Sequence, residues 1–257
     1  MKETTITVKE KVEPNSAVLI EGLPGQGMVG KIAVEHLIKC LKAKKIAELY
    51  SPHYAYYVLV NKAGSIRLLR SEFHYWKNEN GGSDLILLTG DTQPQTIEGQ
   101  YEVADAILGF AQQNNVKFVL TIGGYRTEAK AEPQIFVSAT SQELLSKASD
   151  LGIKSSPPGS PIVGTAGLLI GLANLCNLDA ACLLVETLGY LPDPKAAKSV
   201  VKAISRILNV DVDFSGLDSE IAKSEQIEKR MRKIEEQRRA TEKTKRRIEE
   251  EKVSYIG

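Results

Sequence analysis

The sequence has few cysteines, little net charge and no long apolar run. Its three cysteines, Cys40, Cys176 and Cys182, are odd in number and lack CxxC spacing. They are typical of thiols in a reducing cytoplasm, not of a disulfide framework. A formal net charge of +1 gives no general attraction to nucleic acid. The longest apolar run, 162–176, is too short to cross a membrane and suits a buried helix. The polar start of the chain lacks the apolar region of a signal peptide. We therefore expect a cytoplasmic protein that binds neither nucleic acid nor membrane.

Metal-binding and catalytic patterns are missing as well. His36, His53 and His74 lie far apart, without the spacing of a metal site. Ser156 and Ser160 lie in a Pro/Gly-rich loop and not in a G-x-S-x-G elbow. No nucleophile, base and orienting group can be assembled from the sequence. We expect no metal, no cofactor and no catalytic residue, and the sequence favours a protein that is not an enzyme.

Residues 1–215 alternate between short apolar runs and segments with helical spacing. Such an order predicts a three-layer α/β/α sandwich with a mixed, mostly parallel sheet in one domain. The charged residues 216–257 then form a separate helical extension. The expected buried strands are 17–20, 84–89, 118–122 and 181–186, the expected helices are 31–41, 97–113, 141–151 and 194–208, a hairpin is expected at 54–60 and 65–70, and an edge strand at 4–8.

The composition changes abruptly after residue 215. Residues 219–252 are mostly Glu, Lys and Arg. Their apolar seam is too short for a long coiled coil, but charge pairs four residues apart support a helix with weak or local self-association. The chain then closes with a small apolar segment whose Tyr and Ile can bury area in a partner, and whose carboxylate can pair with a lysine. This expected partner-binding segment is Val253, Ser254, Tyr255, Ile256 and Gly257. The alternative is a charged tail without a role.

A glycine-rich turn follows the first buried strand. Gly25, Gly27 and Gly30 match G-x-G-x-x-G, and with Lys31 the segment also spells G-x-x-x-x-G-K. Ile32, however, stands where a phosphate-binding loop has a Ser or Thr hydroxyl for magnesium. Two readings follow: a tight turn that lets the helix approach the sheet closely, or an anion site at the helix N-terminus.

Charged residues near other expected strand ends are the remaining candidates. Arg126 follows the strand 118–122 and is the best further anion-binding residue. Glu48 is the one acidic residue at the spacing of a ribose partner, but it lies inside an apolar run. Four carboxylates near the end of strand 84–89 are expected to cap a turn or line a solvated helix face: Asp91, Glu98, Glu102 and Asp105.

Three segments resemble the archaeal branch of the proteasome-assembly-chaperone family. They are EGLPGQGMVG at 21–30, TIGGY at 121–125 and GYLPDPKAA at 189–197. The resemblance covers about residues 10–210, and the charged tail completes it. It implies a phosphorylase/hydrolase-like α/β/α fold, a homo-oligomer and a C-terminal tail that docks on proteasome α-subunits. Family tails of the activator type have a penultimate Tyr, whereas here Tyr255 is third from the end and Ile256 is penultimate. Relatives have also been classed with ATP-dependent ligases.

Two functions remain open on these grounds. The favoured one is a non-enzymatic chaperone or adaptor for proteasome assembly, since the charged extension and its apolar end have no role in an enzyme core. The alternative is a nucleotide- or phosphate-dependent enzyme, ligase-like, that uses the loop 25–31.

Overall fold

A computed structural model describes residues 1–127, 132–227, 229–230 and 234 of the chain. By contacts the chain divides into two compact units, Met1–Leu217 and Asp218–Gly257. The boundary lies just after Leu217, whose side chain is fully buried. In the second unit, residues 218–227 are helical, as are the described residues 229, 230 and 234. The rest of the helix expected over 219–252 lies outside the described residues.

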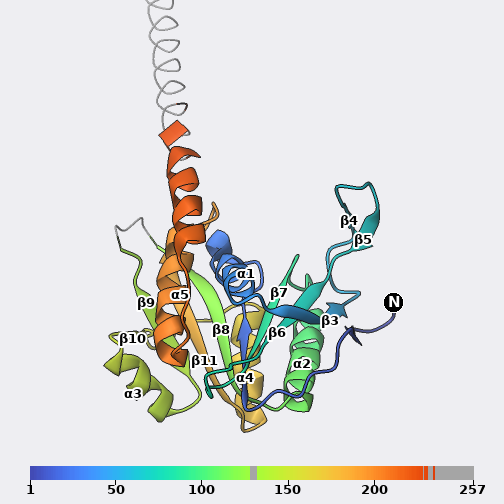
Figure 1. Cartoon of the computed structure of the whole chain (residues 1–257), viewed down its shortest axis with the longest axis horizontal. Helices are drawn as coiled ribbons and strands as arrows, with labels where there is room; N and C mark the ends of the chain where they lie inside the picture. The colour runs from blue at the N-terminus through green and yellow to red at the C-terminus, as the bar shows by residue number, and fades with distance from the viewer. Residues whose placement is uncertain (128–131, 228, 231–233, 235–257) are drawn as a thin grey trace, which may run out of the picture. The chain divides into compact units, whose positions relative to one another are not determined.

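The first unit is built on one large mixed sheet (Figure 1). Its nine strands are ordered β1-β3-β6-β7-β2-β8-β11-β9-β10, and β4 and β5 form a separate hairpin. The central strands β7, β2, β8 and β11 run parallel. Strands β3 and β6 pair with their neighbours in antiparallel fashion, and β9 is antiparallel to β11 but parallel to β10. The strands are β1 (Thr5–Val8), β2 (Ala17–Glu21), β3 (Lys44–Tyr50), β4 (Val58–Val60), β5 (Ile66–Leu68), β6 (Ser71–Trp76), β7 (Leu85–Gly90), β8 (Val116–Arg126), β9 (Ile135–Ala139), β10 (Lys154–Ser155) and β11 (Asp179–Thr187).

Helices cover both faces of the sheet, which confirms the predicted three-layer α/β/α architecture. Helices α1, α3 and α5 pack on one face around one apolar core. Helices α2 and α4 pack on the other face around a second core. The helices are α1 (Val29–Leu41), α2 (Ile97–Gln113), α3 (Gln142–Asp150), α4 (Thr165–Leu175) and α5 (Pro194–Leu208), with a short 3₁₀ turn η1 (Gln26–Met28) before α1.

Local sequence explains the element bounds. All five residues of β2 are buried, as expected for a continuous apolar run inside a parallel sheet. Helix α2 begins where the Thr96 side chain accepts a hydrogen bond from the Gly99 amide. Helix α5 begins with Asp193 as its cap and Pro194 in the first turn, and it ends at Asn209 in the left-handed conformation. The caps fix where α2 and α5 begin, and therefore where the loops that precede them at the carboxyl edge of the sheet end.

The order of the strands creates a switch point beside β2. Helix α1, which follows β2, covers one face of the sheet, whereas helix α2, which follows β7, covers the other. Because β2 and β7 are parallel neighbours, their following loops diverge at the carboxyl edge. Ligands of open α/β sheets bind at such a place. A ligand site is therefore expected between the loops after β2 and β7.

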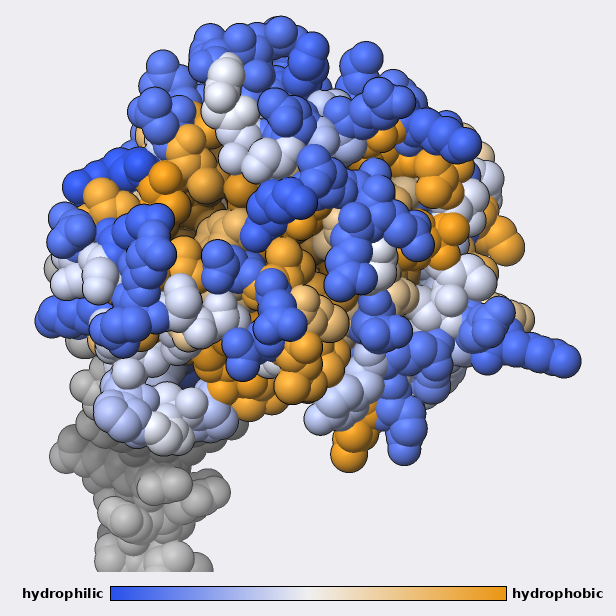
Figure 2. All heavy atoms as spheres, turned by 90° about the horizontal axis from the view of Figure 1, so that it is seen from below, coloured by the Kyte–Doolittle hydropathy of each residue, from blue (hydrophilic) through white to orange (hydrophobic). Residues whose placement is uncertain are grey.

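Apolar side chains also reach the surface. Figure 2 shows apolar areas among charged side chains on the face seen from below. The hairpin β4–β5 has Val58, Val60, Ile66 and Leu68 on one face, each more than two-fifths exposed. The predicted hairpin at 54–70 is thus confirmed, and one of its faces is open to solvent. Among the described residues, no helix is long and apolar enough to cross a membrane.

Candidate functional site

The three sequence segments that carry the family resemblance meet at the carboxyl edge of the central strands. The Gly27 amide donates to the Gly189 carbonyl oxygen at 3.1 Å, and the Asp193 amide donates to the Gly27 carbonyl oxygen at 2.8 Å. A Cβ atom on Gly124 would overlap with the Gln26 carbonyl oxygen. The turn after β2 is therefore held between the ends of β8 and β11, which lie far from it in the sequence.

Thr187 at the end of β11 locks this arrangement. Its hydroxyl donates to the Asp193 carboxylate at 2.8 Å, and the same carboxylate accepts from the Ala196 amide at 2.9 Å. Gly27 has φ of 60°, and a Cβ there would overlap with the Thr187 hydroxyl. Only glycine combines this backbone conformation with the absence of a side chain. The glycine turn and the cap of α5 thus form one connected unit.

Two further glycines bring α1 close to the sheet. A Cβ on Gly22 would overlap with the Gly30 carbonyl oxygen, and a Cβ on Gly30 would lie 2.8 Å from the Ile122 carbonyl oxygen. Real Cβ atoms do not approach backbone so closely. The structure therefore has the tight strand-to-helix turn that was one of the two readings of the glycine motif.

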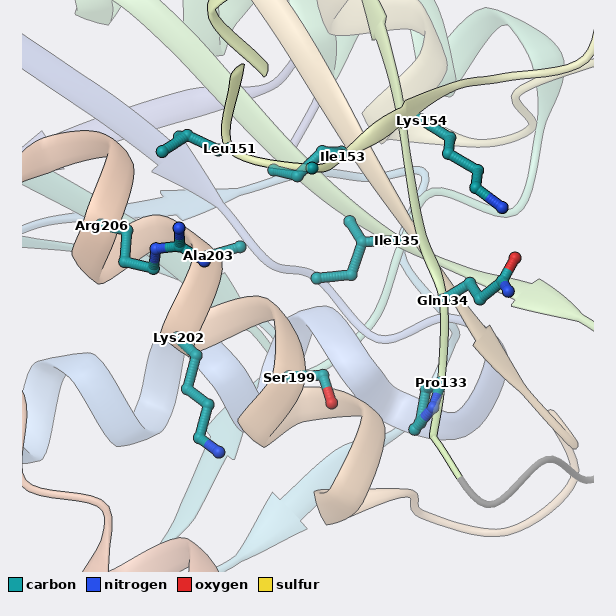
Figure 3. A pocket seen from close by; sticks show the side chains of 11 residues that line it. Pro133, Gln134, Ile135, Leu151, Ile153, Lys154, Ser199, Lys202, Ala203 and Arg206 are labelled. Carbon is teal, nitrogen blue, oxygen red and sulfur yellow. The ribbon is translucent and has the colours of Figure 1, made fainter. Parts of the chain in front are cut away.

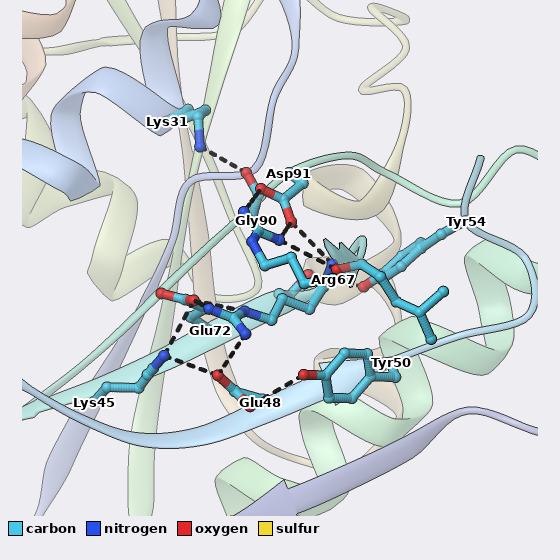
Figure 4. Close-up of polar contacts among 12 residues, drawn as sticks. Lys31, Lys45, Glu48, Tyr50, Tyr54, Arg67, Glu72, Gly90 and Asp91 are labelled. Atoms are coloured by element: carbon cyan, nitrogen blue, oxygen red, sulfur yellow. Dashed lines mark hydrogen bonds and ion pairs between the residues drawn. The ribbon is translucent and has the colours of Figure 1, made fainter. Parts of the chain in front are cut away.

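Lys31 and Arg126, the two cations expected to bind an anion at this turn, contact different parts of the structure. The Lys31 Nζ donates to the Gly90 carbonyl oxygen at 2.8 Å (Figure 4). It also pairs with Glu35 at 2.6 Å. Arg126 lies at the end of β8, and a Cβ on Gly189 would be 3.5 Å from its Cγ. Its stem thus lies beside Gly189, whose carbonyl oxygen accepts from the Gly27 amide. An anion site formed by Gly25, Gly27, Gly30, Lys31 and Arg126 stays a prediction.

Gln93, in the loop after β7, connects this loop to the loop after β2 and to the start of α4. Its amide nitrogen donates to the Pro24 carbonyl oxygen at 2.7 Å, and its amide oxygen accepts from the Thr165 amide at 3.0 Å. One side chain therefore connects three loops at the switch point. Sequence reasoning missed this residue, because a lone Gln in a turn carries no pattern.

A network of charges lies on the β3–β6 side of the sheet (Figure 4). Glu48 on β3 pairs with Lys45 at 2.8 Å, Arg70 at 3.0 Å and Lys9 at 3.2 Å. Arg70 also pairs with Glu72 on β6 at 2.6 Å. Strands β6 and β7 stand between β3 and β2 in the sheet. Glu48 is thus a structural member of this network, and it is separated from the glycine turn it would have to serve as a ribose partner.

The network controls the ionisation of Glu48. Burial alone would raise the pKa of this carboxyl, but hydrogen bonds from Lys45 and Lys9 and the charge of Arg70 outweigh it and lower the pKa to about 2. The folded state therefore gains stability from the ionised carboxylate above the ordinary pKa of 4.5 and loses that stability as the pH falls towards 2.

Glu48→Gln is accordingly expected to lower the free energy of unfolding at pH 7 by about 1–3 kcal/mol, because three charged partners lose their acceptor charge. The deficit should shrink as the pH falls below about 4.5. Urea unfolding at pH 7 and pH 3.5 measures both effects. Glu143→Gln is the control, since Glu143 is exposed and Lys147 is its ion-pair partner among the described residues. A deficit that grows on acidification would contradict the prediction.

The four carboxylates predicted near the end of β7 do not converge. Asp91 pairs with Arg67 through both carboxylate oxygens and accepts from the Arg70 amide at 3.0 Å (Figure 4). Glu102 pairs with His53 at 3.2 Å. Glu98 and Asp105 are exposed on α2, as expected for a solvated helix face. Asp91 instead ties the base of the β4–β5 hairpin to the loop after β7.

The histidines also have separate partners. The His36 Nε2 lies 2.8 Å from the Asp213 carbonyl oxygen, and His74 lies 3.2 Å from Glu72. Among the described residues, no group of three or more His, Cys, Asp or Glu side chains is placed to hold a metal ion.

Glu21 is a buried carboxyl that sequence reasoning also missed. It ends β2, lies opposite Thr121 of β8 and is 1 % exposed. One of its oxygens accepts from the Leu23 amide at 2.9 Å, and the other has no partner within the described part of the chain. Burial, only partly offset by that hydrogen bond, raises its pKa to about 7. A glutamate at the end of a buried strand was the available signal.

The predicted partner-binding segment, Val253 to Gly257, lies outside the described residues. The geometry of the site above therefore belongs to residues 1–217 alone.

Comparison with known proteins agrees with this fold and this set of converging loops. The model of the PAC2 family matches residues 19–235. The chain thus has the fold of the proteasome-assembly-chaperone homologues, and it belongs to the PAC2 family.

Solved structures and curated relatives support this assignment. Pyrococcus furiosus PbaB, described as an archaeal proteasome activator, is 41% identical, with a TM-score of 0.87 over 90% of this chain and 100% of that chain. P. furiosus PbaA, described as an archaeal homolog of proteasome-assembly chaperone, is 28% identical, with a TM-score of 0.75 over 95% of this chain and 98% of that chain. The uncharacterized protein MJ1210 of Methanocaldococcus jannaschii is 34% identical over 100% of this chain and 98% of its own length. None of these three is described as an ATP-dependent ligase.

Proposed function

We propose that this protein is a non-enzymatic chaperone or adaptor of the proteasome that acts in the cytoplasm as a homo-oligomer. The observation that carries the proposal is the likeness to PbaB, which spans all of that chain at 41% identity. PbaA, whose description refers to proteasome assembly, supports the same class of partner. The structure of the glycine turn agrees, because its backbone groups are used to hold the loops at the ends of β8 and β11 together.

The partner surface is proposed to be the proteasome α-subunits, and the docking element the segment 253–257. This segment combines Tyr255 and Ile256, which can bury apolar area in a pocket, with a preceding run of glutamates that favours solvent. One short segment must offset its own ordering entropy and binds weakly. Several copies on an oligomer bind an α-subunit ring by avidity, which is the reason for an oligomeric body.

Deletion of residues 253–257 is expected to weaken binding to purified α-subunit rings by at least about tenfold, because the apolar anchors are lost. Surface plasmon resonance with immobilised α-rings measures this. The thermal unfolding of the body should stay unchanged. Tyr255→Ala combined with Ile256→Ala should reproduce the loss, and Ser254→Ala is the matched control within the same segment. Equal binding by the intact and deleted chains would place docking on the body.

A nucleotide- or phosphate-dependent enzyme that uses the loop 25–31 is the second candidate. The observation in its favour is that the stem of Arg126 lies beside Gly189, which is hydrogen-bonded to the glycine turn at the carboxyl edge of the sheet. Against it, Lys31 is engaged by Gly90 and Glu35. Calorimetry with ATP separates the two: micromolar binding that Lys31→Ala abolishes would favour the enzyme.

A further inference from the structure

A pocket lies away from the glycine turn, between α5 and the segment that joins α3 to β10 (Figure 3). Its volume is about 340 Å³, within the range of small-molecule sites. Ile135 of β9 lies at its centre, with Leu151 and Ile153 on one side. Ile153 belongs to the apolar core under α1, α3 and α5 and is only 7% exposed, and the partly buried Ile135 and Leu151 pack against that core. The floor of the pocket is therefore apolar and firmly packed.

The rim of the pocket is cationic. Lys202 and Arg206 come from α5 on one side, and Lys154 comes from β10 on the other (Figure 3). Of the 11 lining residues none is acidic. Within the part of the chain that the structure describes, these three cations have no ion-pair partner. The positive charge of the rim is thus not neutralised by neighbouring side chains.

The three cations lie close enough around the pocket to repel one another. Lys202 and Arg206 are four residues apart on α5 and so lie on the same side of the helix, where like charges destabilise it. Lys154 adds a third positive charge across the same opening. An anion between them would remove this repulsion, and the planar guanidinium of Arg206 suits a carboxylate or phosphate group.

We propose that this pocket binds a small organic anion, in which one oxyanion group is carried on an apolar body. The apolar body lies on Ile135, Leu151 and Ile153, and the oxyanion pairs with Lys202, Arg206 and Lys154. Both halves of the ligand are required, because Ile135, Leu151 and Ile153 offer it no polar partner and the three cations offer it no apolar surface beyond their stems. A carboxylate and a phosphate monoester share this chemistry.

The test uses the full chain and the fluorescent probe 8-anilinonaphthalene-1-sulfonate, which joins a sulfonate to an aromatic body. Lys202→Gln combined with Arg206→Gln is expected to weaken its binding by at least about tenfold, since two charge-assisted contacts are lost. Lys117→Gln combined with Lys195→Gln is the matched control: both lysines are exposed, lie outside the pocket and remove the same charge. The control should bind the probe within about twofold of the unchanged chain.

Competition experiments test the contributions of the charged group and of the apolar body separately. Phenyl phosphate and 4-phenylbutyrate should displace the probe at concentrations at least about tenfold lower than 4-phenylbutan-1-ol, which lacks the charge, or inorganic phosphate, which lacks the body. The better of the two competitors assigns the head group. Equal displacement by the alcohol would reduce the site to an apolar hole, and equal displacement by inorganic phosphate would reduce it to a diffuse cationic surface. Either result overturns the proposal.

Methyl NMR tests whether the ligand binds in this pocket. The δ1 methyl signals of Ile135 and Ile153, assigned with Ile135→Val and Ile153→Val, should shift on addition of 4-phenylbutyrate. Unmoved signals at both positions, or equal probe binding by the Lys202/Arg206 double variant, would show that binding occurs elsewhere and would refute the assignment of this pocket.

Discussion

Gly22→Ala is expected to lower the free energy of unfolding by at least about 3 kcal/mol, a large part of the stability of an ordinary domain. The added methyl group would overlap with the Gly30 carbonyl oxygen and with the Val34 side chain. Backbone in the first turn of α1 cannot move aside without separating that helix from β2 and β8. Urea unfolding of the variant, followed by circular dichroism, measures the loss.

Gly171→Ala is the matched control for this change. Gly171 is an exposed residue of α4, and a Cβ there would meet no atom within 4 Å. Alanine restricts the unfolded chain and favours the helix, so this variant should gain about 0.5–1 kcal/mol. If Gly22→Ala unfolds within about 1 kcal/mol of the unchanged chain, close packing is not the reason for the glycine at this position.

The parts of the fold that the sequence could predict are those with a local signal. The apolar runs 17–20 and 84–89 became β2 and β7, because strands buried on both faces have no alternation to obscure them. The edge strand expected at 4–8 is β1 at the margin of the sheet. Strand β6, by contrast, was not predicted. Its Ser71, Glu72 and His74 are polar. Ser71 is buried beside the Tyr54 hydroxyl, Glu72 pairs with Lys45 and Arg70, and His74 pairs with Glu72 within the strand itself.

The site shows the same division. A glycine-rich turn between a strand and a helix can be read directly, and with it the close approach of α1. The residues that pack around that turn cannot be predicted from the sequence. The neighbours of Gly27 lie far from it in the sequence: they are Thr187, Gly189 and Asp193. Only the parallel pairing of β8 and β11 brings them to Gly27. Gln93 and Glu21 carry no pattern of their own, so their roles follow from tertiary contacts alone.

The buried carboxyl of Glu21 should make the stability of the protein fall as the pH rises from about 4.5 to about 7. Its pKa is about 7 in the folded state, against an ordinary value of 4.5, because burial disfavours the charged form. Below pH 4.5 the group is protonated in both states and costs nothing. Between about pH 4.5 and 7 the unfolded chain releases its proton and the folded chain keeps it, so stability is lost as the pH rises. Above about pH 7 the full loss, about 3 kcal/mol, remains.

Glu21→Gln removes this ionisation, so its free energy of unfolding relative to the unchanged chain should rise by about 3 kcal/mol between pH 4.5 and pH 8.5. The amide has nearly the same shape and keeps an oxygen for the Leu23 amide. Chemical unfolding of both chains at each pH measures the difference, and all other titrating groups cancel in it. Glu48→Gln, measured between pH 3.5 and pH 7, is the internal control, because the pKa of Glu48 is lowered and its effect has the opposite sign in that range. If the Glu21→Gln difference is flat with pH while the Glu48→Gln difference varies, Glu21 is ionised in the folded protein at neutral pH. A cation or polar group would then have to reach the oxygen that has no partner within the described residues.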